Sequence, residues 1–247
     1  LREVATEGWH DRGMYEFLLD LWKLNHALPM ERRIIVIAAD IPRPYSTFKT
    51  TDEQNKFFDT VEDRDHCMAR IIENYMNSKK DNRNCLFIVG SGHVFKTGET
   101  AGSFLSKKFK DGKVFTIFTH CPIIDNSGTI SGRIRHGIFD HAFYKTGNIP
   151  VAFLLKDSPF GKELFDGLSN DGSGLYQDNY DGYIFLGSLE TEPSDYNLYD
   201  IYSDDFVKEL SRRASLDNTT VQKYWGINEA TKEAIISKLK EDEIKSR

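Results

Sequence analysis

The chain has 247 residues, of which 39% are hydrophobic and 28% charged, and its formal net charge is −6. This length suffices for one sizeable hydrophobic core, and the composition is typical of soluble globular proteins. The negative charge, without a basic run that would neutralise phosphates, excludes a general nucleic-acid binder. The three widely spaced cysteines predict neither a disulfide framework nor a C-x-x-C metal clip, although a single bridge in an exported protein stays open.

The sequence gives little information on compartment. No apolar run has the length of a transmembrane helix, and no signal peptide is visible. The chain starts at Leu1 rather than at a methionine. If it is a processed fragment, export as a periplasmic protein or lipoprotein is slightly favoured over the cytoplasm. The expected partner is a small-molecule substrate, and the oligomeric state is left open.

Apolar periodicity predicts the elements of the first half of the chain. Residues 2–7 alternate and read as the tail of a strand, with Glu7 at its end. Residues 33–39 form an apolar run and read as a buried strand. Helical spacing predicts further elements that begin at Asp11, near Glu53 and near Glu62.

The most informative stretch is the apolar run of residues 85–89, which ends in Gly90-Ser91-Gly92-His93. Such a run is typical of a strand buried on both faces. Glycines at the carboxyl end of a strand let the backbone approach a ligand, and ligands bind at this edge of open α/β sheets. We therefore predict that His93 carries chemistry and that the three residues before it bind the ligand. The alternative is a hydrogen-bonded structural histidine.

Arg64 is a second candidate. It lies four residues before Met68, so a helix places both on the same apolar face. The helix dipole disfavours a cation in the first turn, and an inward-facing arginine needs a carboxylate or an anionic ligand. The alternative is a solvated side chain in a frayed first turn.

The second half of the chain completes the predicted fold. Residues 99–108 read as a crossover helix, and residues 113–119, 149–155 and 182–187 as strands. Residues 125–141 read as a long loop that borders the cleft and brings His120 or His136 towards the ligand. We predict an α/β fold with a mainly parallel sheet of five or six strands and helices on both faces. Residues 1–203 form the core domain, and residues 204–247 a helical segment packed on it or extending from it.

The helix motif Arg64-Asp-x-x-Met-Ala69 and the later Gly90-Ser-Gly-His-Val94 turn resemble the erythromycin esterase-like proteins. In that family an R-D-x-x-M-A helix precedes a strand that ends in an H-N-x-H-V turn. The upstream Thr6-Glu7-Gly8 and the segment 181–186 are similar to family stretches as well. The resemblance covers roughly residues 1 to 190. The wider superfamily includes ChaN-like haem-binding proteins and the Tiki and TraB metalloprotease-like proteins.

The resemblance implies a cleft at the carboxyl ends of the strands and attack of water on an ester without metal or other cofactor. His93 matches the second histidine of the family's turn, Arg64 the helix arginine and Glu7 the early glutamate, and we expect these three to converge. Gly90 replaces the first histidine, and the family's G-E-x-x-H-G motif would lie before Leu1. Two alternatives therefore stay open: a haem or other small-molecule binding protein without catalysis, and a metal-assisted hydrolase.

Overall fold

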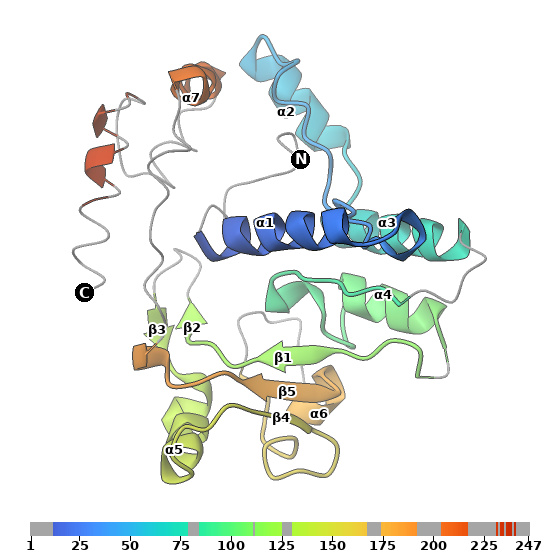
Figure 1. Ribbon diagram of the computed structural model, residues 1–247, viewed down its shortest axis with the longest axis vertical. Helices are drawn as coiled ribbons and strands as arrows, with labels where there is room; N and C mark the ends of the chain where they lie inside the picture. The colour runs from blue at the N-terminus through green and yellow to red at the C-terminus, as the bar shows by residue number, and fades with distance from the viewer. Residues whose placement is uncertain are drawn as a thin grey trace. The chain divides into compact units, whose positions relative to one another are not determined.

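The computed structural model divides the chain into two compact units (Figure 1). We call Glu62–Glu192 the central unit, and Leu1–Val61 together with Pro193–Arg247 the terminal unit. No helix in the described part of the chain is both long and apolar enough to cross a membrane. The structure describes residues 12–78, 84–110, 112–124, 130–166, 174–191 and 204–216, and positions 231, 233–234, 236–238 and 240.

The central unit is built on a three-stranded mixed sheet in the order β1-β5-β4. Figure 1 shows the three strands side by side. β1 (Ile117–Thr119) pairs in parallel with β5 (Gly182–Phe185), and β5 pairs antiparallel with β4 (Val151–Leu154). A separate antiparallel pair consists of β2 (Ile123–Ile124) and β3 (Ile130–Gly132).

The predicted parallel sheet of five or six strands is therefore wrong. Residues 33–39 and 84–90 are outside any strand, although both are rich in apolar residues. Ile35 is 49% exposed and Leu86 is 80% exposed, so neither run is buried as we expected. An apolar run indicates the tendency to extend, but strand pairing also depends on distant backbone that the local sequence does not specify.

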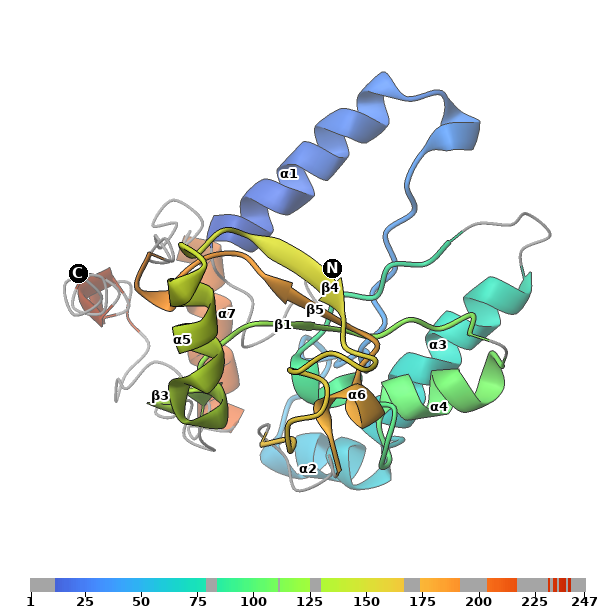
Figure 2. The same ribbon diagram turned by 90° about the horizontal axis from the view of Figure 1, so that it is seen from below.

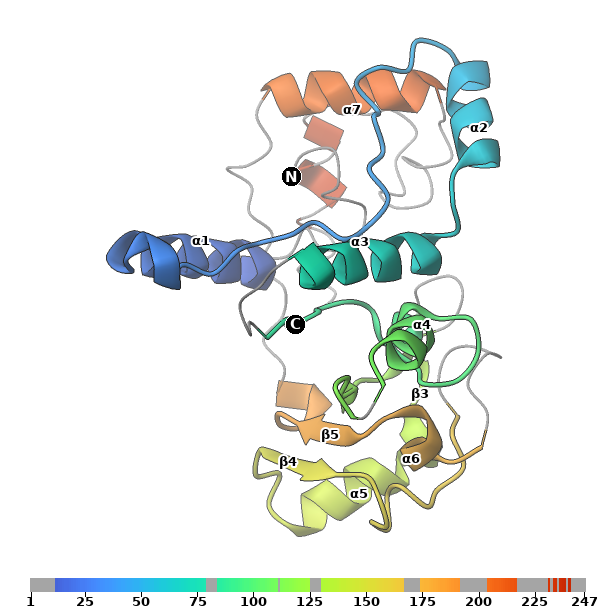
Figure 3. The same ribbon diagram turned by 90° about the vertical axis from the view of Figure 1, so that its right-hand side faces the viewer.

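Local signals predicted the helices of the central unit better. α3 (Arg64–Ser78) confirms the helix expected near Glu62, and α4 (Ala101–Lys108) the one expected over residues 99–108. The Thr100 hydroxyl caps α4 by accepting a hydrogen bond from the Ser103 N–H. The two helices pack against each other, as Figures 2 and 3 show.

The segment predicted as a long loop, residues 125–141, is not all loop. Positions 125–129 lie outside the described residues, but β3 and the 3-10 helix η3 (Ile134–Gly137) follow them. The short helices after η3 are α5 (Ile138–Lys145), α6 (Tyr176–Asn179) and η4 (Leu189–Thr191).

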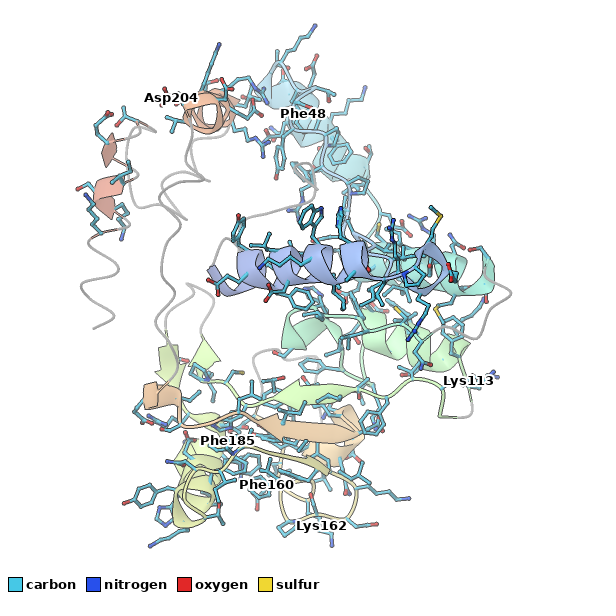
Figure 4. All side chains as sticks on the ribbon, in the orientation of Figure 1. Phe48, Lys113, Phe160, Lys162, Phe185 and Asp204 are labelled. Atoms are coloured by element: carbon cyan, nitrogen blue, oxygen red, sulfur yellow. The ribbon has the colours of Figure 1, made fainter. Side chains whose placement is uncertain are left out.

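Aromatic rings fill the core of the central unit. Tyr183 of β5 is opposite Phe118 of β1 and Phe153 of β4 in the sheet register. The rings of Phe143 and Phe185 stack with their centroids 3.8 Å apart. Large flat rings that pack edge-to-face and offset give a dense core at few positions. Figure 4 labels Phe185 together with Phe160, another ring of this cluster. The buried aromatic members of the core cluster are Phe95, Phe118, Phe139, Phe143, Tyr176, Tyr180, Tyr183 and Phe185, and Ile134 and Leu155 are buried among them.

The terminal unit joins two segments that are far apart in sequence. Its helices are α1 (Arg12–Ala27), η1 (Met30–Arg32), α2 (Thr51–Thr60) and α7 (Asp204–Leu216). The guanidinium of Arg212 on α7 donates to the backbone carbonyls of Tyr45 and Phe48 before α2. The helix expected after residue 204 is thus present as α7, while the domain division predicted at residue 204 stays a prediction.

Candidate functional site

A short 3-10 turn presents His93. Residues 84–90 are extended and lead into η2 (Ser91–His93). The N–H groups of His93 and Val94 donate to the carbonyls of Gly90 and Ser91, at 3.0 and 3.3 Å. The N–H groups of Ser91 and Gly92 make no hydrogen bond within the described residues. The turn therefore leaves two adjacent backbone donors for a ligand or for water.

Asp65 holds the imidazole of His93. The Nδ1 atom lies 2.9 and 3.1 Å from the two carboxylate oxygens of Asp65. The N–H of Ala101, the first residue of α4, donates to the same carboxylate at 2.7 Å. The helix dipole favours a negative charge at this end of α4, so the carboxylate is fixed where the helix stabilises it.

The tautomer of His93 follows from this contact. An ionised carboxylate only accepts hydrogen bonds, so Nδ1 of His93 must be the donor. In the neutral ring the lone pair is then on Nε2, which has no hydrogen-bond partner among the described residues. The side chain of His93 is 25% exposed. The ring thus presents a proton acceptor that solvent and a small ligand can reach.

Contacts with the segment that joins α6 to β5 also hold the turn in place. The Tyr180 hydroxyl donates to the Ser91 carbonyl at 3.1 Å. Three residues after His93, the Lys96 ammonium pairs with Asp181 at 2.7 Å. These bonds join the turn to a fully buried tyrosine and to the start of β5, so the position of His93 depends on the aromatic core.

α4 also presses closely on the turn. A Cβ atom added at Gly102 would lie 2.5 Å from the backbone carbon and oxygen of Val94, the residue after His93. Only glycine allows this approach. At Gly92, in contrast, an added Cβ would meet nothing within 4 Å. The backbone of the turn is therefore tightly packed on the α4 side and open at Gly92.

The structure places the other predicted residues differently. Arg64 is the half-buried first residue of α3, and the next residue, Asp65, contacts Nδ1 of His93 at 2.9 Å. Glu7 lies outside the described residues, so its convergence with His93 stays a prediction. Sequence reasoning missed Asp65, although it is the aspartate of the same R-D-x-x-M-A motif.

His120, at the end of β1, lies in a different cluster. Its Nδ1 is 2.6 Å from the hydroxyl of Tyr183, and its Nε2 is 3.4 Å from a carboxylate oxygen of Asp140. The side chain is 1% exposed. Burial lowers the pKa of His120, and the carboxylate of Asp140 opposes this effect in part. Both ring nitrogens are engaged within the core.

His136 lies in neither cluster. It is an exposed residue of η3, and its backbone φ of 54° follows a φ of 49° at Arg135. Two consecutive residues other than glycine in the left-handed region are unusual and cost conformational energy. The side chain of His136 makes no hydrogen bond or ion pair within the part of the chain that the structure describes. The predicted role of His136 in ligand binding stays a prediction.

A small apolar cavity lies beside the turn that carries His93. Ser91 lines it, together with the rings of Phe95, Phe118 and Tyr180. Its volume of about 10 Å³ corresponds to roughly one water molecule. Within the described residues, no group of three or more histidine, cysteine, aspartate and glutamate side chains is arranged to hold a metal ion.

No protein-family model, curated protein or solved structure matches this chain. The resemblance to the erythromycin esterase-like proteins therefore stays a prediction from the motifs alone.

Proposed function

We propose that the protein is a hydrolase of the erythromycin esterase-like type that cleaves an ester or a related carbonyl bond of a small molecule. One observation carries the proposal: the Nδ1 of the half-buried His93 lies 2.9 Å from the carboxylate of Asp65, and its Nε2 has no partner in the described structure. A base needs an unprotonated nitrogen, a fixed ring orientation and access to the substrate.

In the proposed reaction, each of these groups has one role. Nε2 of His93 removes a proton from a water molecule as the water oxygen bonds to the carbonyl carbon. The Asp65 carboxylate stabilises the imidazolium that forms, as the third group of a catalytic triad does. When the tetrahedral intermediate collapses, the carbon–oxygen bond to the leaving alcohol breaks. The proton on His93 then passes to the leaving oxygen, so the products are an acid and an alcohol.

Negative charge develops on the carbonyl oxygen during this reaction. In this proposal, the backbone of the turn stabilises that charge. The N–H groups of Ser91 and Gly92 are adjacent donors on the same turn as the base. Fixed backbone donors of this kind stabilise an oxyanion without reorganisation at the moment of reaction. Arg64, next to Asp65 in the chain, is the proposed contact for an anionic or carbonyl part of the substrate.

The first experiment measures hydrolysis of p-nitrophenyl esters of increasing acyl length by the purified chain. His93→Gln should lower kcat/KM by about 10²- to 10⁴-fold, the usual contribution of a general base. His26→Gln is the matched control, because His26 is an exposed residue of α1 with no proposed role in the site. Equal rates for His93→Gln and the wild type, with both proteins folded, would overturn the proposal.

A pair of glycine substitutions tests the role of the backbone donors. Gly92→Ala and Gly132→Ala each add a methyl group where nothing lies within 4 Å. Neither should change stability by more than about 0.5 kcal/mol. If a carbonyl oxygen docks on the turn, the methyl group at position 92 hinders it, and only Gly92→Ala should slow ester hydrolysis. An unchanged rate for Gly92→Ala would show that substrate does not approach this backbone.

A further inference from the structure

One buried hydroxyl joins the start of α4 to the chain that follows His93. Thr100, the residue before α4, is only 3% exposed. Its hydroxyl donates to the carbonyl of Phe95 at 2.6 Å and accepts from the N–H of Ser103 at 3.1 Å. A hydroxyl group can donate one hydrogen bond while it accepts another, and Thr100 uses both capacities. The cap of α4 is therefore bonded to a residue two positions after His93.

The same end of α4 holds the carboxylate of Asp65. Ala101, which directly follows Thr100, donates its N–H to Oδ1 of Asp65 at 2.7 Å. That carboxylate in turn lies 2.9 Å from Nδ1 of His93. An N–H in the first turn of an α-helix has no partner within the helix, so it is available for such a contact. The position of Asp65 relative to His93 therefore depends on where α4 starts.

The cap of α2 shows how a helix of this chain is capped without such a link. The hydroxyl of Thr50, which is exposed, accepts from the N–H of Glu53 at 3.2 Å. Within the described residues its side chain makes no other hydrogen bond. Capping thus requires only the accepted bond. The bond that Thr100 donates to Phe95 is additional, and it fixes α4 against the segment that carries His93.

We propose that Thr100 is a positioning residue of the His93 site. It acts through the N–H of Ala101, which keeps the carboxylate of Asp65 in contact with Nδ1 of His93. Without the bond to Phe95, α4 can shift relative to the turn, and the N–H then no longer aligns with the carboxylate. A misplacement of about 1 Å can slow a reaction by about 100-fold. This role rests on the proposed function, in which His93 is the base.

The test compares two variants that each delete one hydroxyl group of the central unit. Thr100→Val keeps the size of the side chain and removes both hydrogen bonds. Ser158→Ala is the matched control. The Ser158 hydroxyl likewise donates to one backbone carbonyl, of Leu155, and accepts from one N–H, of Gly161, outside the His93 site. Long-range ¹H–¹⁵N NMR reads the tautomer of His93, because the hydrogen bonds of the ring determine which nitrogen carries the proton.

The wild type and Ser158→Ala should both show His93 protonated at Nδ1, whereas Thr100→Val should show a mixture with the Nε2–H tautomer. The kcat for p-nitrophenyl esters should fall by about 10- to 100-fold in Thr100→Val. Thr100→Ser keeps the hydroxyl and should retain the wild-type tautomer and kcat. A folded Thr100→Val variant with the wild-type tautomer, or an equal change in Ser158→Ala, would overturn the proposal.

Hydrogen exchange at the Ala101 amide keeps the test valid if Thr100→Val does not fold. This amide should exchange slowly in the wild type and faster in Asp65→Ala, which removes its acceptor. Equal rates in the two proteins would overturn the proposal, because Thr100 would then have no bond through which to act. If the tautomers change as expected but no ester is cleaved, the proposed function fails while the positioning role of Thr100 is supported.

Discussion

His93 and His120 follow similar apolar stretches, yet their surroundings differ. Both contact a group at Nδ1, and both have a carboxylate within 3.4 Å of a ring nitrogen. The His93 side chain is 25% exposed and uses one nitrogen, whereas the His120 side chain is 1% exposed and uses both. A histidine can serve as a base only if one nitrogen stays available to the substrate.

The difference comes from the backbone around each histidine. His93 is on a 3-10 turn that follows an extended segment outside any strand, and its ring contacts Asp65 while the side chain stays 25% exposed. His120 directly follows β1, and its N–H still donates to Ile184 of the neighbouring strand. Its ring therefore points into the aromatic core, where Phe143 and Phe185 pack around it. The proposed base and the buried histidine of the core therefore differ in burial and in the number of ring nitrogens that are engaged.

The largest expected effect comes from Asp65→Asn. The amide no longer requires Nδ1 of His93 to be the donor and cannot balance the charge of the imidazolium. We expect the rate of ester hydrolysis to fall by about 10²-fold or more. Asp59→Asn, on an exposed position of α2, is the control. A folded Asp65→Asn variant with the wild-type rate would show that the contact is only structural.

Gly102→Ala is expected to have the next largest effect, because it disturbs the support of the turn without touching His93. The new methyl group would lie 2.5 Å from the Val94 backbone, so α4 and the turn must separate. We expect a loss of about 1–3 kcal/mol in the free energy of unfolding, together with slower hydrolysis. Denaturant unfolding measures the first effect. Full stability and full activity would contradict the close packing described here.

Tyr183→Phe tests the His120 cluster. It removes the hydroxyl that lies 2.6 Å from Nδ1 of His120 and leaves a buried ring nitrogen without a partner. The free energy of unfolding should fall by about 1–3 kcal/mol. Hydrolysis per folded molecule should not change. Tyr144→Phe, at a position that is 67% exposed, should change stability by less than about 0.5 kcal/mol.

The pH dependence of stability is the smallest expected effect. Burial lowers the pKa of His120 below its ordinary value of 6.5, so the unfolded chain binds this proton more readily than the folded chain. The contribution of His120 to stability is therefore complete above about pH 6.5 and is lost as the pH falls below it. One proton gives a slope of at most about 1.4 kcal/mol per pH unit. His120→Gln should reduce this slope, and an identical slope in the two proteins would contradict the assignment.

Much of the local structure could be predicted from sequence. The apolar spacing that predicted a helix near Glu62 depends on residues within a few turns, and α3 follows it. The turn with His93 was predicted from its two glycines, and the structure shows it as η2. Such signals are local, so they need no knowledge of distant partners.

The sheet and the partners of the histidines were beyond local reasoning. β4 pairs antiparallel with β5, which depends on residues about 30 positions apart and on how the chain turns between them. Asp65 reaches His93 across 28 positions, and Tyr183 reaches His120 across 63. The motif named Arg64 as the functional residue of its helix, but helical geometry and the start of α4 bring its neighbour to the histidine.

The most direct test is the tautomer of each histidine, measured by long-range ¹H–¹⁵N NMR at a pH above the ordinary histidine pKa of about 6.5. His93 should carry its proton on Nδ1, because Asp65 can only accept, and should leave Nε2 unprotonated. His120 should carry its proton on Nε2, which faces the Asp140 carboxylate, and accept from Tyr183 at Nδ1. If His93 is instead protonated at Nε2, its available nitrogen is not a base, and the proposed mechanism is contradicted.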